Sequence, residues 1–373
     1  MSVEAAPLAR PPRDQRLDVL RGWMQLSIFI SHVVGTSLAW GIHAAWGLSD
    51  SSEMFILLSG FTLGSVFSLK LARSGPMAAQ RDMLARTFRL YRAHLTVFFM
   101  FAAMVIAADM FVPMPFAVDR FGWCFLVDRP WAALPAAATM LYQPDFMGIL
   151  PIFVFGMLLL GPFLLAAARI GAWALVPSFL LYLATWLGWI ATPALGGSTI
   201  GFDPLAWQFL YLLGAWMGRR ALYRQPLPRA PWMLAGAGAI LLLGLAARLV
   251  EHGFVEGPAV AGWALQHKEV LAPTRLIHAL SLAYLVAVLV PRQAGWMETM
   301  PGRALASIGR HSLRVFCTGL FLAWGVSRVM EARPENPPML GVVLVLTGMA
   351  ALWTVAVLSD GIRRPVVSGR ATR

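Results

Sequence analysis

Ten long apolar runs constrain the fold of this chain more than any other feature of its sequence. A helix needs about 20 predominantly apolar residues to cross the hydrocarbon core of a bilayer. Because backbone groups that face lipid must be satisfied within their own segment, each run predicts a helix. The runs cover residues 22–42, 51–70, 95–112, 146–167, 172–191, 205–219, 232–250, 275–291, 311–330 and 339–358. The sequence therefore predicts an all-α, polytopic integral membrane protein with about ten transmembrane helices in one bundle.

The composition agrees with a membrane protein. Hydrophobic residues make up 58% of the chain and charged residues 13%, whereas soluble domains carry about 25% charged residues. The connections between runs are short, so residues 1–373 are predicted to form a single membrane-embedded domain. Within it we expect a cytoplasmic tail over 1–16, an amphipathic interfacial segment over 76–94 and a basic cytoplasmic tail over 359–373.

The basic residues predict the orientation of the bundle. They gather before the first run and between the second and third, at positions 10, 13, 16, 21, 70, 73, 81, 86, 89 and 92. Since Lys and Arg accumulate on the cytoplasmic side, both termini are predicted to be cytoplasmic. The net charge of +12 is then explained by topology and by anionic headgroups of the bilayer, without any nucleic acid. The basic block 81–94 within this interfacial segment is predicted to lie against lipid headgroups around the bundle, or alternatively to form a basic rim that attracts an acyl-CoA.

The cysteines and histidines do not predict a metal site or a disulfide. Cys124 falls in a predicted exterior loop and Cys317 in the ninth run, so they are poorly placed to pair. No spacing of Cys and His resembles a metal-binding motif. We therefore expect no metal and no permanently bound cofactor.

Arg21 and His32 share one face of the first predicted helix. Eleven residues at 100° each bring them within roughly 20° of one another, and the rise of 1.5 Å per residue separates them by about 16 Å along the axis. Arg21 would thus lie at the inner surface, where it could bind phosphate, and His32 near mid-membrane. An ionisable side chain inside a span is a functional-site hypothesis by default.

The same residues carry a resemblance to a known superfamily. "RLDVLRG" (16–22), the eleven-residue spacing to His32 and "EMFILLSGF" (53–61) resemble the opening of the acyltransferase-3 superfamily of membrane acyltransferases. Five segments, the first of which includes "EMFILLSGF", are similar, in the same order, to the OpgC family. These are "DSSEMFILLSGFTLG" (50–64), "YQPDFMGILPIFV" (142–154), "DPLAWQFLYLLG" (203–214), "PTRLIHALSLA" (273–283) and "IGRHSLRVF" (308–316).

The resemblance implies an O-succinyltransferase in the inner membrane of Gram-negative bacteria. Its donor substrate would be cytoplasmic succinyl-CoA, and its acceptor a glucose hydroxyl of osmoregulated periplasmic glucans. His32 would act as the general base or as a nucleophile that carries the acyl group, and we favour the base. Glu53 matches the acidic residue of the superfamily motif, where it would orient His32 or line the acceptor path. Alternatively, Glu53 is a carboxylate favoured at a helix start.

Candidates for donor binding are Arg21, Arg310 and His311. The last two begin the ninth run on the inner side, where the phosphates of a CoA thioester would arrive. Alternatively, Arg310 is one of the cytoplasmic basic residues that set the orientation of the bundle, and His311 lies at the membrane interface. Asp18 and Arg21 also have the i,i+3 spacing of an interfacial ion pair.

Candidates for binding the acceptor or the acyl group lie toward the outer side. Gln143 and Asp145 would bind the sugar or the succinyl carboxylate, or simply form a solvated loop. Arg275, on one face with His278, would hold the free carboxylate of succinate by a bidentate bond, or would extend to the surface. Trp207 is a candidate for stacking on sugar rings, as are Trp40 and Trp46.

Two other functions remain open from the sequence. An O-acetyltransferase of another envelope glycan would differ only in the size and charge of its pocket. A transporter or flippase would also place polar residues in ten helices, but it predicts paired broken helices and internal symmetry that the sequence does not show. The oligomeric state is unknown from the sequence.

Overall fold

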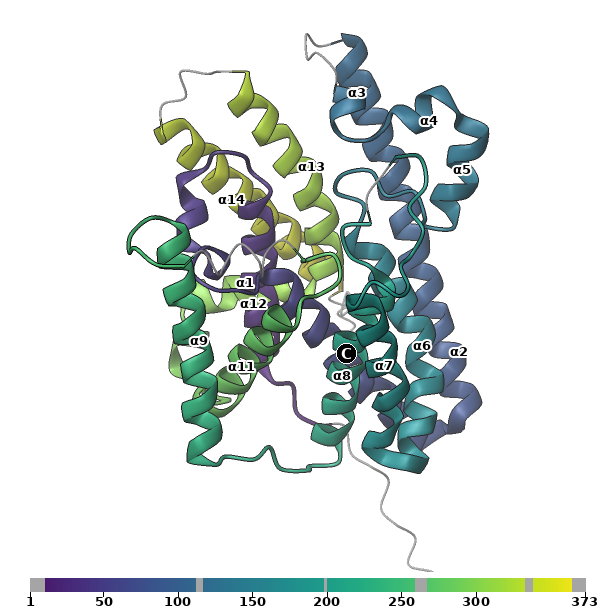
Figure 1. The fold of residues 1–373 in the computed structure, drawn as a ribbon, viewed down its shortest axis with the longest axis vertical. Coiled ribbons are helices and arrows are strands. Elements are labelled where there is room, and N and C mark those ends of the chain that lie inside the picture. Colours follow the sequence, from purple (N-terminus) through teal and green to yellow (C-terminus); the bar gives the residue numbers. More distant parts are fainter. Residues whose placement is uncertain (1–10, 112–116, 198–199, 259–266, 333–337, 364–373) are drawn as a thin grey trace, which may run out of the picture. The chain divides into compact units, whose positions relative to one another are not determined.

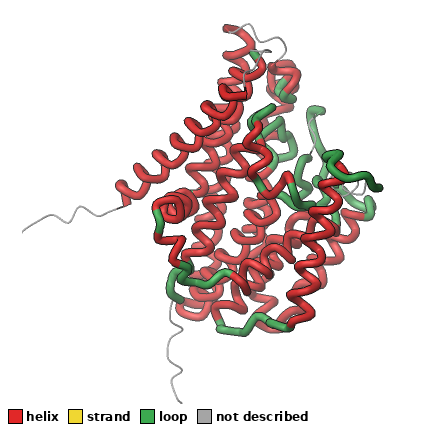
Figure 2. Tube along the Cα trace, turned by 90° about the vertical axis from the view of Figure 1, so that its left-hand side faces the viewer, coloured by secondary structure: helices red, strands yellow, loops and turns green. Residues whose placement is uncertain are grey.

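The computed structural model describes residues 11–111, 117–197, 200–258, 267–332 and 338–363. Figure 2 shows helices and loops, with no strand among these residues. The predicted all-α class is thus confirmed. The chain divides into two compact units: residues 1–12, 47–49 and 53–284 form unit 1, and residues 13–46, 50–52 and 285–373 form unit 2. The single membrane-embedded domain stays a prediction.

Unit 1 contains most of the helices in the first three quarters of the chain. Their bounds are α2 (Ser51–Phe111, from Glu53 in this unit), α3 (Ala117–Arg120), α4 (Cys124–Asp128), α5 (Pro130–Ala138), α6 (Ile149–Ile170), α7 (Leu175–Trp186), α8 (Pro204–Leu222), α9 (Pro231–Glu251) and α11 (Pro273–Leu289, to Tyr284 in this unit). The short 3₁₀ helix η3 (Gly171–Ala174) joins α6 to α7. Both α6 and α7 pack against α8 (Figure 1).

The second and third apolar runs belong to one helical stretch, α2, which bends at Gly75. Gly75 has a φ of 79°, which interrupts the helical backbone, and Pro76 follows it. Glycine adopts positive φ without steric cost, and proline suits the first position of a helix because its missing N–H would be unpaired there. The predicted interfacial segment 76–94 is therefore the first part of the second arm of α2.

Two GxxxG motifs bring α2 and α8 into backbone contact. Gly60 and Gly64 of α2 face the carbonyls of Tyr211 and Ala215, while Gly214 and Gly218 of α8 face carbonyls of α2. A Cβ at any of these four glycines would clash with a backbone oxygen. Close packing through small residues is the usual means of helix association where lipid removes the hydrophobic driving force. This crossing holds Glu53 and its helix in register with α8.

Unit 2 contains the first helix and the C-terminal helices. Their bounds are α1 (Gln15–Ser31), the 3₁₀ helices η1 (Ser37–Gly41), η2 (His43–Ala45) and η4 (Gly295–Glu298), and the helices α12 (Met300–Arg310), α13 (Ser312–Glu331) and α14 (Pro338–Arg363). Helix α1 packs along α12 and also on α13, which in turn packs on α14. Phe29 and Ile30 of α1, Val315 of α13 and Leu352 of α14 belong to one apolar core.

The predicted span 22–42 is wrong in its second half. Helix α1 ends at Ser31, and residues 33–50 form turns and 3₁₀ segments. Gly35 has a φ of 74°, which ends the helical path, and the Thr36 hydroxyl accepts a hydrogen bond from the amide of Leu38 at the start of η1. The conformation of Gly35 and the hydrogen bond of Thr36 are local features of the backbone, and mean hydropathy does not detect them. His32 therefore lies at a helix end and not within a continuous span.

Five helical segments among the described residues are long and apolar enough to cross a bilayer. They are Ser51–Phe111, Ile149–Trp186, Pro231–Glu251, Ser312–Glu331 and Met339–Ile362. This supports an integral membrane protein, while the count of ten spans and the cytoplasmic termini stay predictions. Within the fifth run, α-helix extends only from Leu175 to Trp186 in α7, after the 3₁₀ helix η3. At the C-terminal end, α14 continues to Arg363, so the start of the predicted tail at residue 359 is helical.

We expect Gly218→Ala to lower the free energy of unfolding by about 1–3 kcal/mol, because the added methyl overpacks the contact with α2. The measurement is thermal unfolding in detergent followed by tryptophan fluorescence. Gly236→Ala is the matched control: Gly236 lies in α9, and its added Cβ would meet nothing within 4 Å. Equal unfolding midpoints for the two variants would contradict the role of the glycine contact.

Candidate functional site

His32 closes the C-terminal end of α1. Its Nδ1 lies 2.7 Å from the carbonyl oxygen of Ile28, and the same carbonyl accepts a hydrogen bond from the Ser31 hydroxyl at 2.9 Å. The same carbonyl also accepts the backbone N–H of His32 at 3.2 Å, so the side-chain bonds reinforce a carbonyl that is already paired. The imidazole itself is exposed. His32 thus combines a structural bond to the helix end with an accessible ring edge.

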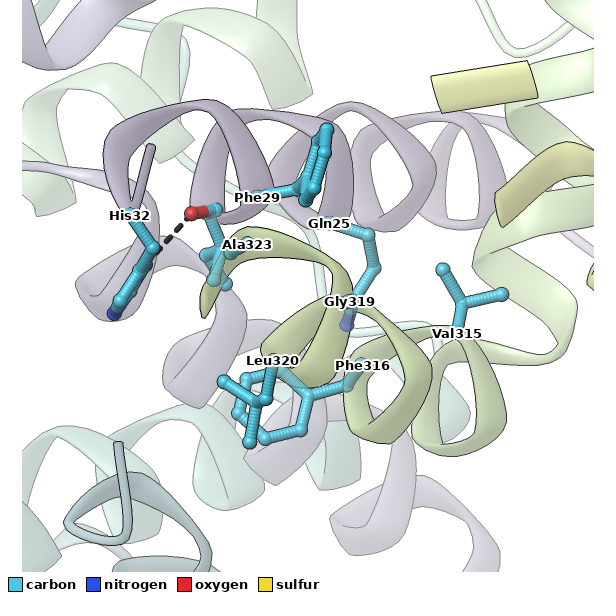
Figure 3. A pocket seen from close by; sticks show the side chains of 9 residues that line it. Gln25, Phe29, His32, Val315, Phe316, Gly319, Leu320 and Ala323 are labelled. Atoms are coloured by element: carbon cyan, nitrogen blue, oxygen red, sulfur yellow. Dashed lines mark hydrogen bonds between the residues drawn. The ribbon is translucent and has the colours of Figure 1, made fainter. Parts of the chain in front are cut away.

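The bond to Ile28 determines the tautomer of the imidazole. A carbonyl oxygen only accepts hydrogen bonds, so Nδ1 must carry the proton that is donated to it. In the neutral ring the lone pair is then on Nε2. Figure 3 shows the far edge of the ring turned away from the Ile28 carbonyl. Nε2 is therefore the nitrogen that can accept a proton from a substrate.

His32 also lines a small pocket between α1 and α13 (Figure 3). The other lining residues are Gln25, Ile28, Phe29, Val315, Phe316, Gly319, Leu320 and Ala323. All of them belong to unit 2. Apart from His32 and Gln25, every lining residue is apolar. The pocket is thus a narrow apolar space with two polar groups, both contributed by α1.

Ser327 of α13 holds the turn that follows His32. Its hydroxyl donates to the carbonyl of His32 and accepts from the amide of Val34, each at 3.1 Å. Ser327 is buried. These two bonds fix the backbone on both sides of residue 33 to α13. They therefore limit how far the imidazole can move from the pocket.

Arg21 lies in α1 as predicted, with helical backbone throughout the stretch to Ser31. The shared face of Arg21 and His32 is thus consistent with the observed helix, and Arg21 is half-buried. The carboxylate of Asp18 accepts two hydrogen bonds from Arg13, at 2.6 and 3.0 Å. This hydrogen bond raises the pKa of the Arg13 guanidinium. Asp18 therefore ties the segment before α1 to the helix.

Arg310 and His311 converge on a carboxylate that the sequence analysis did not select. The Asp360 oxygens accept from Arg310 at 2.7 Å, lie 2.8 Å from His311 Nε2, and accept from the Ser307 hydroxyl at 2.7 Å. His311 is buried, whereas Arg310 and Asp360 are each about one-third exposed. The cluster joins α12, α13 and α14. The Asp360 carboxylate neutralises part of the positive charge that Arg310 and His311 were predicted to offer to the phosphates of the donor. Donor binding by these two residues therefore stays a prediction.

Glu53 and Arg275 form a buried ion pair in unit 1. The Nε and Nη2 atoms of Arg275 each lie 2.6 Å from Oε1 of Glu53. The side chains are 0% and 2% exposed. Glu53 lies in the first turn of α2, as the helix-start interpretation predicts, and it also links α2 to α11. Arg275 does not extend to the surface, and its guanidinium binds this carboxylate.

His278 lies one turn after Arg275 on α11, facing the segment before α2. Its Nδ1 is 2.8 Å from the Ser49 hydroxyl, and both residues are buried. A Cβ at Gly244 of α9 would clash with the other edge of the ring. Near them, Arg248 of α9 donates to the carbonyl of Gly47 at 3.0 Å. The prediction that Arg275 and His278 share a face of α11 is consistent with these contacts.

Trp207 does not have the exposure that sugar stacking needs. Its side chain is 0% exposed, and its Nε1 donates to the carbonyls of Lys268 and Glu269. The ring packs edge-on against Phe202 at 5.0 Å. This burial and these contacts do not favour stacking of Trp207 on a sugar, and that role stays a prediction. Trp40, in contrast, is 47% exposed.

Gln143 and Asp145 differ in exposure. Gln143 is buried, and its Nε2 donates to the carbonyl of Met140 at 2.8 Å within the same turn. Asp145 has an exposed side chain, while its amide donates to the carbonyl of Phe121. Of the two, Asp145 is better placed to meet a solute. The short helices α4 and α5 precede this turn.

Sequence reasoning missed Asp360, Ser327, Ser49 and Gln25. Asp360 had a usable signal, since an acidic residue beside an apolar run requires a partner. The others are neutral polar residues within or beside apolar runs, and such residues carry no distinctive pattern. No group of three or more His, Cys, Asp or Glu among the described residues could hold a metal ion.

Comparison with known proteins identifies one family. A family model with the description "OpgC protein" matches residues 13–364, nearly the whole chain. No curated protein and no solved structure matches significantly.

We expect Glu53→Gln to lower the free energy of unfolding by about 3–5 kcal/mol, because it leaves the buried guanidinium of Arg275 without its counter-ion. The double variant Glu53→Gln, Arg275→Met removes both charges and should recover most of that loss. Unfolding in detergent measures the two single variants, Glu53→Gln and Arg275→Met, and the double variant. Arg86→Gln serves as the control, since Arg86 pairs with Asp82 at partly exposed positions of α2 and should change stability by at most about 1 kcal/mol. Additive losses in the double variant would argue against a specific pair.

Ser327→Ala should speed hydrogen exchange over residues 32–36 about tenfold or more, because the amide of Val34 loses its acceptor. Mass-spectrometric hydrogen exchange on the detergent-purified protein measures this. The matched control is Ser281→Ala: the Ser281 hydroxyl donates to the Ile277 carbonyl within α11. Unchanged exchange over 32–36 in Ser327→Ala would show that the turn is held by other contacts.

Proposed function

The chain belongs to the OpgC family, and from this premise we propose that it is an O-succinyltransferase of the bacterial inner membrane. Family membership by itself indicates a membrane acyltransferase-like role in glucan modification. In the proposed reaction, a succinyl group passes from cytoplasmic succinyl-CoA to a glucose hydroxyl of periplasmic glucans. The protein needs no resident cofactor for this, and succinyl-CoA is a substrate.

The observation that carries the proposal is the hydrogen bond from His32 Nδ1 to the carbonyl of Ile28. It directs the lone pair of the neutral imidazole to Nε2, on the exposed edge of the ring. A general base must present such a lone pair to the hydroxyl proton that it removes. The backbone bonds made by Ser327 support the same orientation. A base held in this way costs little reorganisation when the reaction occurs.

The proposed transfer balances with His32 as the only proton carrier. Nε2 takes the proton from the glucose hydroxyl while the hydroxyl oxygen attacks the thioester carbonyl. The tetrahedral intermediate then collapses, the carbon–sulfur bond breaks, and the CoA thiolate takes the proton back from the imidazolium. The products are a succinyl ester and CoA. A covalent acyl-imidazole is the alternative, and Nε2 is also the nitrogen on which it would form.

The donor would enter along α1. Arg21, on the same face of this helix, would meet the phosphates of CoA while the thioester lies near His32. The Asp360 cluster places further basic groups, Arg310 and His311, in the same unit. Both bind Asp360, and a phosphate contact by Arg21 rests on its place on α1, on the same face as His32.

The experiment compares the mass of periplasmic glucans from cells that lack the protein with glucans from cells that express it. We expect a succinyl increment with the wild-type protein. We also expect His32→Asn to lower the transfer rate by about 10²–10⁴-fold, since a positioned base contributes about that much. Asparagine can still donate to the Ile28 carbonyl, so the helix end stays capped while the basic nitrogen is lost.

The possible outcomes separate the functions. A glucan mass increased by an acetyl group would show that the protein transfers acetyl and not succinyl. An unchanged mass for every glycan would favour a transporter over an acyltransferase. A purified His32→Asn protein that folds normally and turns over at the wild-type rate would eliminate His32 as base or carrier. A less stable variant with unchanged activity per folded molecule would reduce His32 to its capping role.

A further inference from the structure

Gln25 is a buried polar residue in the pocket beside His32. It lies on α1, is 2% exposed, and lines the space between α1 and α13. Among the described residues, its Nε2 has no hydrogen-bond partner. Figure 3 shows the side chain extending from α1 toward Gly319 of α13. A buried amide donor without a partner costs about 1–3 kcal/mol of stability, so its presence requires a reason.

The lining of the pocket limits what kind of ligand would satisfy this amide. Around Gln25 lie Phe29, Val315, Phe316 and Leu320, all apolar. A sugar ring carries several hydroxyls, and this surface would leave most of them without partners. A lipid acyl chain would suit the apolar walls but would leave the Gln25 amide unpaired. A linear chain of methylene groups interrupted by amides satisfies both, because a primary amide can donate and accept.

The position of Gln25 along α1 agrees with such a chain. Gln25 is four residues after Arg21 and seven before His32, on nearly the same face of the helix. At 1.5 Å per residue it lies about 6 Å from the first and about 10 Å from the second along the axis. A ligand with phosphates at Arg21 and an acyl carbon at His32 must therefore pass Gln25.

We propose that the Gln25 amide binds the amide groups of the pantetheine arm of a coenzyme A thioester and so positions the thioester beside His32. The identity of the ligand rests on the proposed function. Gln25 is a positioning residue, because it holds the donor without touching the reacting atoms. Its role predicts a combination that a structural residue does not show: its loss weakens ligand binding without weakening the fold.

The test uses the full-length protein in detergent, with CoA as the probe in titration calorimetry. Gln25→Leu and Gln25→Met keep the side-chain volume and remove the amide. We expect each to weaken CoA binding about tenfold, the value of one hydrogen bond. Adenosine 3′,5′-bisphosphate, which lacks the pantetheine arm, should bind both variants and the wild type equally. The unfolding midpoint should stay the same or rise, because no hydrogen bond within the protein is lost.

Ser27→Ala is the matched control. Ser27 also lies on α1, is 0% exposed, and its hydroxyl has no partner among the described residues, but it does not line the pocket. This variant should leave CoA affinity unchanged.

Each contrary result identifies which idea is wrong. If the wild-type protein does not bind CoA, the donor in the proposed function and the role of Gln25 both fail. If the wild type binds CoA and both Gln25 variants bind it equally well, only the role of Gln25 fails. A fall in the unfolding midpoint of both variants, or an equal loss of affinity for adenosine 3′,5′-bisphosphate, would also overturn it.

Discussion

The ion pair between Glu53 and Arg275 is the interaction on which unit 1 most depends. Two charges that are almost fully removed from water are tolerated only when each satisfies the other, since an unpaired buried charge costs several kcal/mol. The pair joins the first turn of α2 to α11 across 222 positions of sequence. On α11 it is followed by His278, which contacts Ser49 just before α2. The start of α2 is thus held by two polar contacts from one face of α11.

Unit 2 is organised around the end of α1. At that end the carbonyl of Ile28 accepts the backbone N–H of His32 and the Ser31 hydroxyl, and it also binds the His32 imidazole. Ser327 of α13 then holds the turn that follows. The same bonds that satisfy the helix end also orient the imidazole. Structural capping and the proposed base role are therefore two uses of one geometry, and the His32→Asn variant separates them.

The polar groups of the protein differ in how completely they are satisfied. Arg275 and His311 have carboxylate partners, and Trp207 donates to two carbonyls. Gln25 differs because its buried Nε2 has no partner among the described residues. A buried group that the fold leaves unsatisfied is a reasonable place to look for a ligand contact. The Ser27 hydroxyl is also without a partner among the described residues, but only Gln25 of the two lines the pocket beside His32, and this position supports its role in binding.

Hydropathy along the sequence determined the all-α class and the positions of most helices, and the helical period predicted that Arg21 and His32 share one face. These features depend on the local free energy of transfer into lipid and on the period of one helix, which neighbouring residues specify. Only the tertiary structure decided that α1 stops at Ser31, that Arg275 binds Glu53, and that Trp207 is enclosed. Hydrogen bonds and ion pairs between distant residues depend on which side chains meet in space. Asp360 and Gln25 lie in or beside apolar runs. For that reason the sequence alone could predict neither the partners of Asp360 nor the lack of a partner for the Gln25 amide.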